Sequence, residues 1–190
     1  VPARLLAGAG LVRAGRVGLV ALLVTLAVWW TPQVDTIRSK SNAFKVTRIL
    51  ELHNQVQPGD AVLVLHPEYT PTVRYYLGPD FQWFDALGPV PDPQIFDWRD
   101  ALSRLESAGP RRTLARILPQ IPQGRRLIVF FPIIDGARWN APWTSLVRRR
   151  SGQWQHALDH DPGLAREWSL KAFGWHRPPR GLRVVVYRRL

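Results

Sequence analysis

The feature that most constrains this chain is an uncharged stretch near its start. No residue in 17–34 carries a charge. At about 1.5 Å of rise per residue, the stretch would span roughly 27 Å as a helix, close to the ~30 Å hydrocarbon core of a bilayer. Its valines and leucines favour membrane insertion by roughly 2–5 kcal/mol. The stretch therefore predicts one transmembrane helix.

The flanks of this stretch predict its orientation. Arg13 and Arg16 precede it, Trp29 and Trp30 occupy the place of an interfacial aromatic belt, and Asp35 is the first charge beyond it. We therefore expect a cytoplasmic N-terminal segment and membrane helix over 1–35, and an extracytoplasmic domain over 36–190 at the cell membrane. A cleaved signal peptide is the competing interpretation, but no small-x-small cleavage site follows. A buried core helix is the third alternative.

Composition excludes some chemistry and indicates the kind of partner. The chain has no cysteine, which excludes disulfides and Cys-based catalytic or metal sites. It contains 26 Lys plus Arg against 14 Asp plus Glu, for a net charge of +12. Such a field attracts anions, and membrane lipid headgroups are the preferred partner, although codon bias towards arginine explains the charge equally well. The chain lacks methionine even at position 1, so we expect it to be a piece of a longer protein.

Hydrophobic patterning downstream of the stretch predicts helices that alternate with buried strands. Short continuous apolar runs are typical of strands covered on both faces. We therefore expect a layered α/β domain with a small, mostly parallel sheet behind the membrane helix. The expected strands cover 61–66, 81–86, 127–131 and 182–187, and the expected helices cover 41–57, 70–77, 98–107, 111–118, 142–149 and 162–173.

Signatures of common active sites are missing. The turn after the first expected strand contains no glycine, so neither a dinucleotide-binding turn nor a phosphate loop is present. No G-x-S-x-G elbow and no H-E-x-x-H helix occurs. His156 and His160 stand four residues apart beside Asp159 and Asp161, but they lack a strong third ligand, and a solvated polar face is the preferred interpretation. We expect no metal, no cofactor and no catalytic residue in this chain.

A group of polar and aromatic residues follows the first expected strand. Ligand sites in open α/β sheets favour the carboxyl ends of strands. We therefore predict substrate binding by His66, Glu68, Tyr69, Arg74 and Tyr75. Arg74 would hold a phosphate or carboxylate, and the tyrosines would stack on a sugar or isoprenoid. The alternative is that Tyr75 packs in the core and Arg74 is a surface group.

Arginine pairs and triplets are spread along the chain, at 111–112, 125–126, 148–150 and 188–189. Basic clusters with many tryptophans are typical of nucleic-acid faces. No nucleic-acid module accompanies them, so we expect no nucleic-acid partner. Contact with anionic lipid is the better functional interpretation, and a solvated surface is the simplest one.

The segment 45–78 resembles a known arrangement. It contains Pro-Gly-Asp followed by an apolar strand over 58–64, and then Tyr-Tyr-Leu-Gly over 75–78. This pattern is similar to the region after the last transmembrane helix in bacterial GT-C type polytopic glycosyltransferases, which are mannosyltransferase-like enzymes dependent on polyprenyl-phosphate sugars. In that family these are packing motifs, not catalytic ones.

The resemblance implies that the chain is the C-terminal, membrane-anchored part of a glycosyltransferase of the cell envelope. Its partners would be a lipid-linked sugar phosphate and an acceptor glycan. The family carries its catalytic acidic residues in an outer loop that this chain lacks, so catalysis would lie outside it. The alternative function is a stand-alone membrane-anchored binding or scaffold domain without catalysis.

Overall fold

The computed structural model describes residues 15–31, 42–134, 141–173 and 180–190. The chain divides into two compact units, Val1–Lys40 and Ser41–Leu190, and each is described by itself. The predicted domain boundary between residues 35 and 36 lies outside the described residues and stays a prediction.

The first unit contains a helix over residues 15–31. The described part of this helix includes Gly15, Arg16 and Gly18. Within the part of the chain that the structure describes, no helix has both the length and the apolar content needed to cross a bilayer. The predicted transmembrane helix is therefore wrong. The predicted cell-membrane location with an extracytoplasmic domain depended on that helix and is corrected with it.

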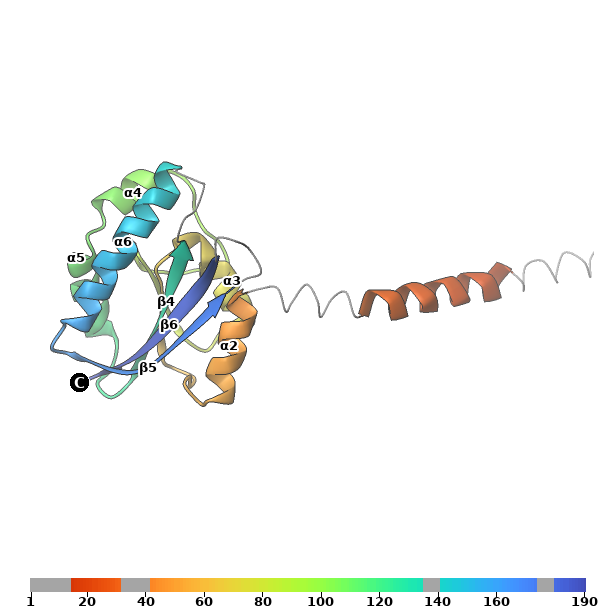
Figure 1. Ribbon diagram of the computed structural model, residues 1–190, viewed down its shortest axis with the longest axis horizontal. Coiled ribbons are helices and arrows are strands. Elements are labelled where there is room, and N and C mark those ends of the chain that lie inside the picture. Colours follow the sequence, from red (N-terminus) through yellow and green to blue (C-terminus); the bar gives the residue numbers. More distant parts are fainter. Residues whose placement is uncertain (1–14, 32–41, 135–140, 174–179) are drawn as a thin grey trace, which may run out of the picture. The chain divides into compact units, whose positions relative to one another are not determined.

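The second unit is an α/β domain built on one six-stranded sheet (Figure 1). Its strand order is β3-β2-β1-β4-β6-β5. The strands are β1 (Ala61–Val64), β2 (Gln82–Asp85), β3 (Gly88–Pro89), β4 (Arg126–Ile134), β5 (Leu164–Phe173) and β6 (Arg180–Arg189). The helices are α2 (Asn42–Leu52), α3 (Thr70–Leu77), α4 (Ala101–Ser107), α5 (Pro110–Ile117) and α6 (Pro142–Asp159), with short 3-10 turns η1 (Pro67–Tyr69) and η2 (Leu118–Gln120).

The sheet is mixed rather than mostly parallel, which corrects the predicted fold. β1 pairs in parallel with β2 and with β4, whereas β2–β3, β4–β6 and β5–β6 are antiparallel. Since β6 runs against both of its neighbours, β5 points the same way as β1, β2 and β4. The last strand of the chain is thus inserted in reverse between two strands of common direction. Apolar runs alone do not encode strand direction, and the sequence could not indicate this insertion.

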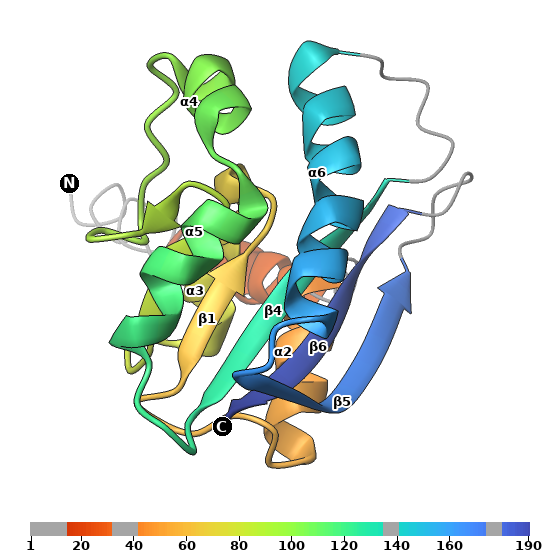
Figure 2. The ribbon, with the colours of Figure 1, turned by 90° about the vertical axis from the view of Figure 1, so that its left-hand side faces the viewer.

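Helices cover both faces of the sheet (Figure 2), and an apolar core lies beneath them on each face. On one face α4, α5 and α6 pack against a core that includes Leu63, Val129 and Trp154. On the other face α2 and α3 pack against a core that includes Val62 and Ile128. Successive residues of β1 thus point into opposite cores, and all four residues of this strand are buried. The continuous apolar run that predicted this strand is explained by burial on both faces.

The helix expected over 162–173 is in fact strand β5. Leu164, Trp168 and Ala172 are spaced by four residues, which fits a helical face as well as one face of a strand. A bulge between Arg166 and Trp168 shifts the register. Leu164 consequently packs on the α6 side of the sheet, while Trp168 and Ala172 pack on the α2 side. The bulge removes the simple alternation by which a strand is recognised.

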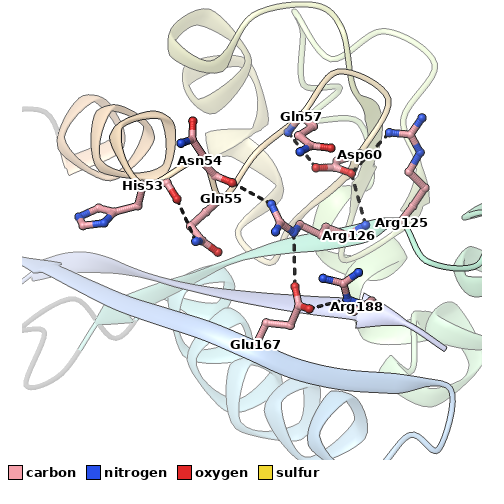
Figure 3. Close-up of polar contacts among 9 residues, drawn as sticks. All are labelled: His53, Asn54, Gln55, Gln57, Asp60, Arg125, Arg126, Glu167 and Arg188. Carbon is pink, nitrogen blue, oxygen red and sulfur yellow. Dashed lines mark hydrogen bonds and ion pairs between the residues drawn. The ribbon is translucent and has the colours of Figure 1, made fainter.

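Polar side chains pin the strands at the edge of the sheet where β1 and β4 begin (Figure 3). The buried Asp60 carboxylate accepts hydrogen bonds from the backbone N–H of Gln57 at 2.9 Å and of Arg126 at 3.3 Å. Glu167 on β5 contacts the Arg126 guanidinium at 3.3 Å and the Arg188 guanidinium at 2.5 Å. The predicted arginine pairs 125–126 and 188–189 therefore meet here, because Arg126 and Arg188 are register partners. Their contacts tie three strands together.

Candidate functional site

The connections of β1 place a crevice at the opposite edge of the sheet. From β1 the chain passes through α3 to β2 on one side, and later through α4 and α5 to β4 on the other. These connections lie on opposite faces. The strand order therefore reverses between β1 and β4, and in open α/β sheets ligands bind outside the carboxyl ends of the strands at such a switch point.

A pocket of about 160 Å³ lies at this position. It is lined by the residues that follow β1, by the carboxyl end of β4, by the amino end of β6 and by the first turns of α2 and α6. These are His66, Glu68, Tyr69, Pro132, Ile133, Ile134, Gly181, Leu182, Asn42 and Thr144. Three of the five residues predicted to bind substrate are among them.

His66 is the most unusual of these residues. It is 7% exposed, and neither ring nitrogen has a hydrogen-bond partner among the described residues. Its Nε2 lies 2.9 Å from Oε1 of Glu68, a close contact that is not aligned as a hydrogen bond. Pro67 opens the short η1 turn immediately after it, so the chain folds back and brings Glu68 beside the imidazole. An unbonded buried polar group costs about 1–3 kcal/mol, which a ligand that bonds it would recover.

Aromatic rings surround this imidazole. The ring of Tyr69 lies 4.7 Å from that of His66, and the ring of Trp143 lies 6.4 Å away. Trp143 in turn contacts Phe96 and Trp98, at 5.8 and 5.5 Å between ring centroids. The α6 helix carries Trp143 in its first turn, so a residue far along the chain completes the wall beside His66.

The other two predicted residues lie elsewhere. Arg74 and Tyr75 are on α3, and neither lines the pocket. Tyr75 is 72% exposed and its ring meets that of Tyr76 edge-on at 5.0 Å. Helical geometry explains the separation, because α3 leads away from the carboxyl edge and each turn carries its side chains further from β1.

Sequence reasoning missed the contributions of β4 and β6 to the pocket. Pro132, Ile133 and Leu182 are apolar residues inside or beside strands, and nothing in their type indicates a site. A signal was available in Pro132, since proline within a strand is confined to edges and irregular ends. The proline lies just beyond Phe130, where the pairing of β4 with β1 ends, while the pairing of β4 with β6 continues to Ile134.

A larger cavity of about 790 Å³ lies beyond β2 and was not predicted. Asp85 lines it with three arginines, Arg104, Arg112 and Arg116. The Asp85 Oδ1 accepts the N–H groups of Leu87 at 2.7 Å and Gly88 at 3.2 Å. Burial raises the pKa of Asp85 to about 6, although these two bonds and the Arg104 charge act to lower it.

Each of the three arginines of this cavity donates a hydrogen bond to a backbone carbonyl of the protein itself. Arg116 donates to the Leu87 carbonyl at 3.0 Å, Arg104 to the Asp97 carbonyl, and Arg112 to the Ser107 carbonyl. The cavity therefore has polar groups that stabilise its own loops. His66 differs from them because its Nδ1 is buried without a polar partner among the described residues, while its Nε2 contacts only Glu68.

His156 and His160 stack on each other, with ring centroids 4.1 Å apart. The Nδ1 of His160 lies 2.9 Å from the His156 carbonyl oxygen. Across the described ranges, no group of three or more His, Cys, Asp or Glu side chains is placed to hold a metal ion. This pair forms part of the exposed surface of α6.

Comparison with known proteins gives few matches. No protein-family model and no curated protein matches this chain. A solved structure from Klebsiella pneumoniae, described as an O-methyltransferase, is similar at 12% identity and a TM-score of 0.37, over 78% of this chain and 80% of that one. The O-methyltransferase from Bacillus cereus in complex with SAH is similar at 12% identity and a TM-score of 0.37, over 76% and 81%.

These findings correct the predicted kinship and function. No family model matches this chain, and no described helix could cross a membrane. The resemblance to a GT-C type glycosyltransferase is therefore wrong. The motifs over 58–64 and 75–78 form a turn into β1 and the end of α3, which are packing features. The predicted partners (membrane lipid, lipid-linked sugar phosphate and acceptor glycan) and the membrane-anchored scaffold are corrected with it.

Proposed function

We propose that the domain binds a small, polar, ring-shaped ligand in the pocket between β1 and β4, and that His66 recognises it. The observation that carries this proposal is a buried imidazole in the pocket wall whose Nδ1 has no polar partner among the described residues and whose Nε2 contacts Glu68. The ligand would form a hydrogen bond with Nδ1 of His66. The proposal includes no covalent step.

The volume and walls of the pocket limit the ligand. A dry cavity of about 150 Å³ holds one benzene molecule, so a pocket of about 160 Å³ fits one ring. Ile133, Ile134 and Leu182 give it an apolar wall. The Glu68 carboxylate accepts only, which favours a ligand with a hydroxyl or amino donor. We therefore expect a single ring that carries a donor for Glu68 and an acceptor or donor for His66.

Calorimetric titration of the full chain with a fragment panel tests this proposal. The panel contains phenols, cyclic polyols and amino-substituted heteroaromatic rings, and SAH as a ligand too large for the pocket. We expect a one-ring compound to bind and His66→Leu to weaken that binding about tenfold or more, since one lost hydrogen bond to a buried group is worth about 1.4 kcal/mol or more. The matched control is His53→Leu, at the exposed position that directly follows helix α2, which should leave affinity unchanged.

Two results would contradict the proposal. One is that no member of the panel shifts the imidazole NMR signals of His66. The other is that SAH binds and His66→Leu leaves its affinity intact, which would indicate a site elsewhere in the domain.

A further inference from the structure

A second cavity, of about 270 Å³, lies between α6 and the strands β4, β5 and β6. The charged residues among its described lining are Arg148, Lys171 and Arg183, and all are cationic. Ser151 and Gly152 of α6 and the residue Phe131 complete much of its wall. The cavity shares 132–134 with the pocket of His66 and lies on the other side of the end of β4.

Strand register brings the cationic groups together. Arg183 of β6 pairs with Phe131 of β4 on one side and with Lys171 of β5 on the other. Residues directly opposite in antiparallel strands point to the same face. Phe131 belongs to the core beneath α6, so Arg183 and Lys171 also face the helix that carries Arg148.

Arg148 has unused hydrogen-bonding groups in this cavity. Its Nε and Nη2 atoms are buried, and neither has a hydrogen-bond partner among the described residues. Together these two groups form the fork with which a guanidinium binds an oxyanion bidentately. A buried guanidinium with no anion beside it is costly, and a bound anion would remove that cost.

Arg183 is held in place rather than mobile on the surface. Its Nη2 donates to Oε1 of Gln155 at 2.7 Å, and its guanidinium carbon lies 4.4 Å from the centre of the Phe131 ring. Burial lowers the pKa of this guanidinium, and the Arg166 charge acts in the same direction. The Asp159 carboxylate, whose charge acts on Arg183, accepts hydrogen bonds from Tyr187 at 2.7 Å and Gln155 at 3.3 Å and does not line the cavity.

We infer that this cavity is an oxyanion site that binds a phosphate group through Arg148, Arg183 and Lys171. The inference does not depend on the ligand proposed for the His66 pocket. Phosphate suits the site because it accepts from several donors at once and its charge compensates a cationic lining.

Titration of the full chain with inorganic phosphate and pyrophosphate at low ionic strength tests the inference. We expect saturable binding, which Arg148→Gln weakens about tenfold or more because two charge-assisted bonds are lost. The phosphate affinity of Arg148→Lys should lie between that of the unsubstituted chain and that of Arg148→Gln, since lysine keeps the charge but cannot form two parallel hydrogen bonds. The matched control is Arg149→Gln, the same charge change at the exposed neighbouring position of α6, which should alter affinity less than twofold.

Thermal unfolding of each variant establishes that it is folded before titration. Absence of saturable phosphate binding by the folded chain would overturn the inference. Equal losses in Arg148→Gln and Arg149→Gln would also overturn it, because they would indicate unspecific attraction to a basic surface. His66→Leu should leave phosphate binding unchanged, so that failure of one proposed site is distinguished from failure of the other.

Discussion

Asp85 is 6% exposed, and burial raises the pKa of its carboxyl from 3.8 to about 6. Between these two values the folded state holds more protons than the unfolded state, so this group lowers the free energy of unfolding as pH rises. Below about pH 4 the carboxyl is protonated in both states and does not lower the free energy of unfolding. Above about pH 6 the decrease in the free energy of unfolding is complete. A pKa shift of about two units corresponds to a decrease of about 3 kcal/mol.

Asp85→Asn should remove this pH dependence. The amide oxygen can still accept the N–H groups of Leu87 and Gly88, and no charge is buried. Urea unfolding of both proteins at pH 4 and pH 7.5 provides the measurement. The free energy of unfolding of the variant, relative to that of the unsubstituted chain, should rise by about 1–3 kcal/mol from pH 4 to pH 7.5. If the difference in unfolding free energy between the two proteins is the same at both pH values, burial does not raise the pKa of Asp85.

At the scale of elements, the ion pairs of Glu167 join three neighbouring strands of the sheet. Its carboxylate contacts Arg126 of β4 and Arg188 of β6 while the residue itself belongs to β5. Its side chain is 25% exposed, so solvent screens these pairs only in part. The contacts stabilise the edge strand at the end where its bulge interrupts the ladder.

Glu167→Gln should lower the free energy of unfolding by about 1 kcal/mol in low salt, and by less in 1 M salt because the ion pairs are screened. The matched control is Glu51→Gln, which breaks the exposed pair with Arg48 on α2 and should cost about 0.5 kcal/mol or less. Chemical unfolding at both salt concentrations compares them. Equal, salt-independent effects would mean that Glu167 acts only through packing.

Strands whose sequence pattern reflects burial alone could be predicted from the sequence. The apolar runs at 61–66 and 127–131 correspond to β1 and β4, since burial on both faces leaves no polar position. Strand β5 could not be predicted, because its spacing of Leu164, Trp168 and Ala172 fits either periodicity and only tertiary pairing decides. Helix α6 reaches Asp159, ten residues beyond the expected end, since the packing of Trp154 and Leu158 overrides the weak pattern of its polar middle.

For the whole molecule, the site could be predicted only where it is local in sequence. His66, Glu68 and Tyr69 directly follow β1, so the rule for carboxyl ends applied to them without knowledge of the fold. Thr144 and Leu182 join them through long-range packing and a reversed strand, which no single-sequence pattern encodes. The membrane prediction depended on the hydropathy of 17–34 alone, and no helix among the described residues has the length and apolar content that it required.

The last prediction concerns how much of the chain the α/β domain needs in order to fold. A chain of residues 41–190 should unfold in one cooperative transition with the same midpoint as the full chain, because α2 begins at Asn42 and the two cores lie wholly within this unit.

A chain of residues 55–190 should not fold, because it lacks α2. Val46 and Leu50 are both 0% exposed, and burial of such a side chain is worth about 1.5–3 kcal/mol. With Ala43, the loss of α2 therefore approaches the roughly 5–15 kcal/mol by which whole domains are stable. It also exposes the second core over β1 and β4 to water. Circular dichroism during heating compares the three chains. A clear loss of stability in the 41–190 chain would mean that residues before α2 contribute to the domain, and the division of the molecule would have to move towards its start.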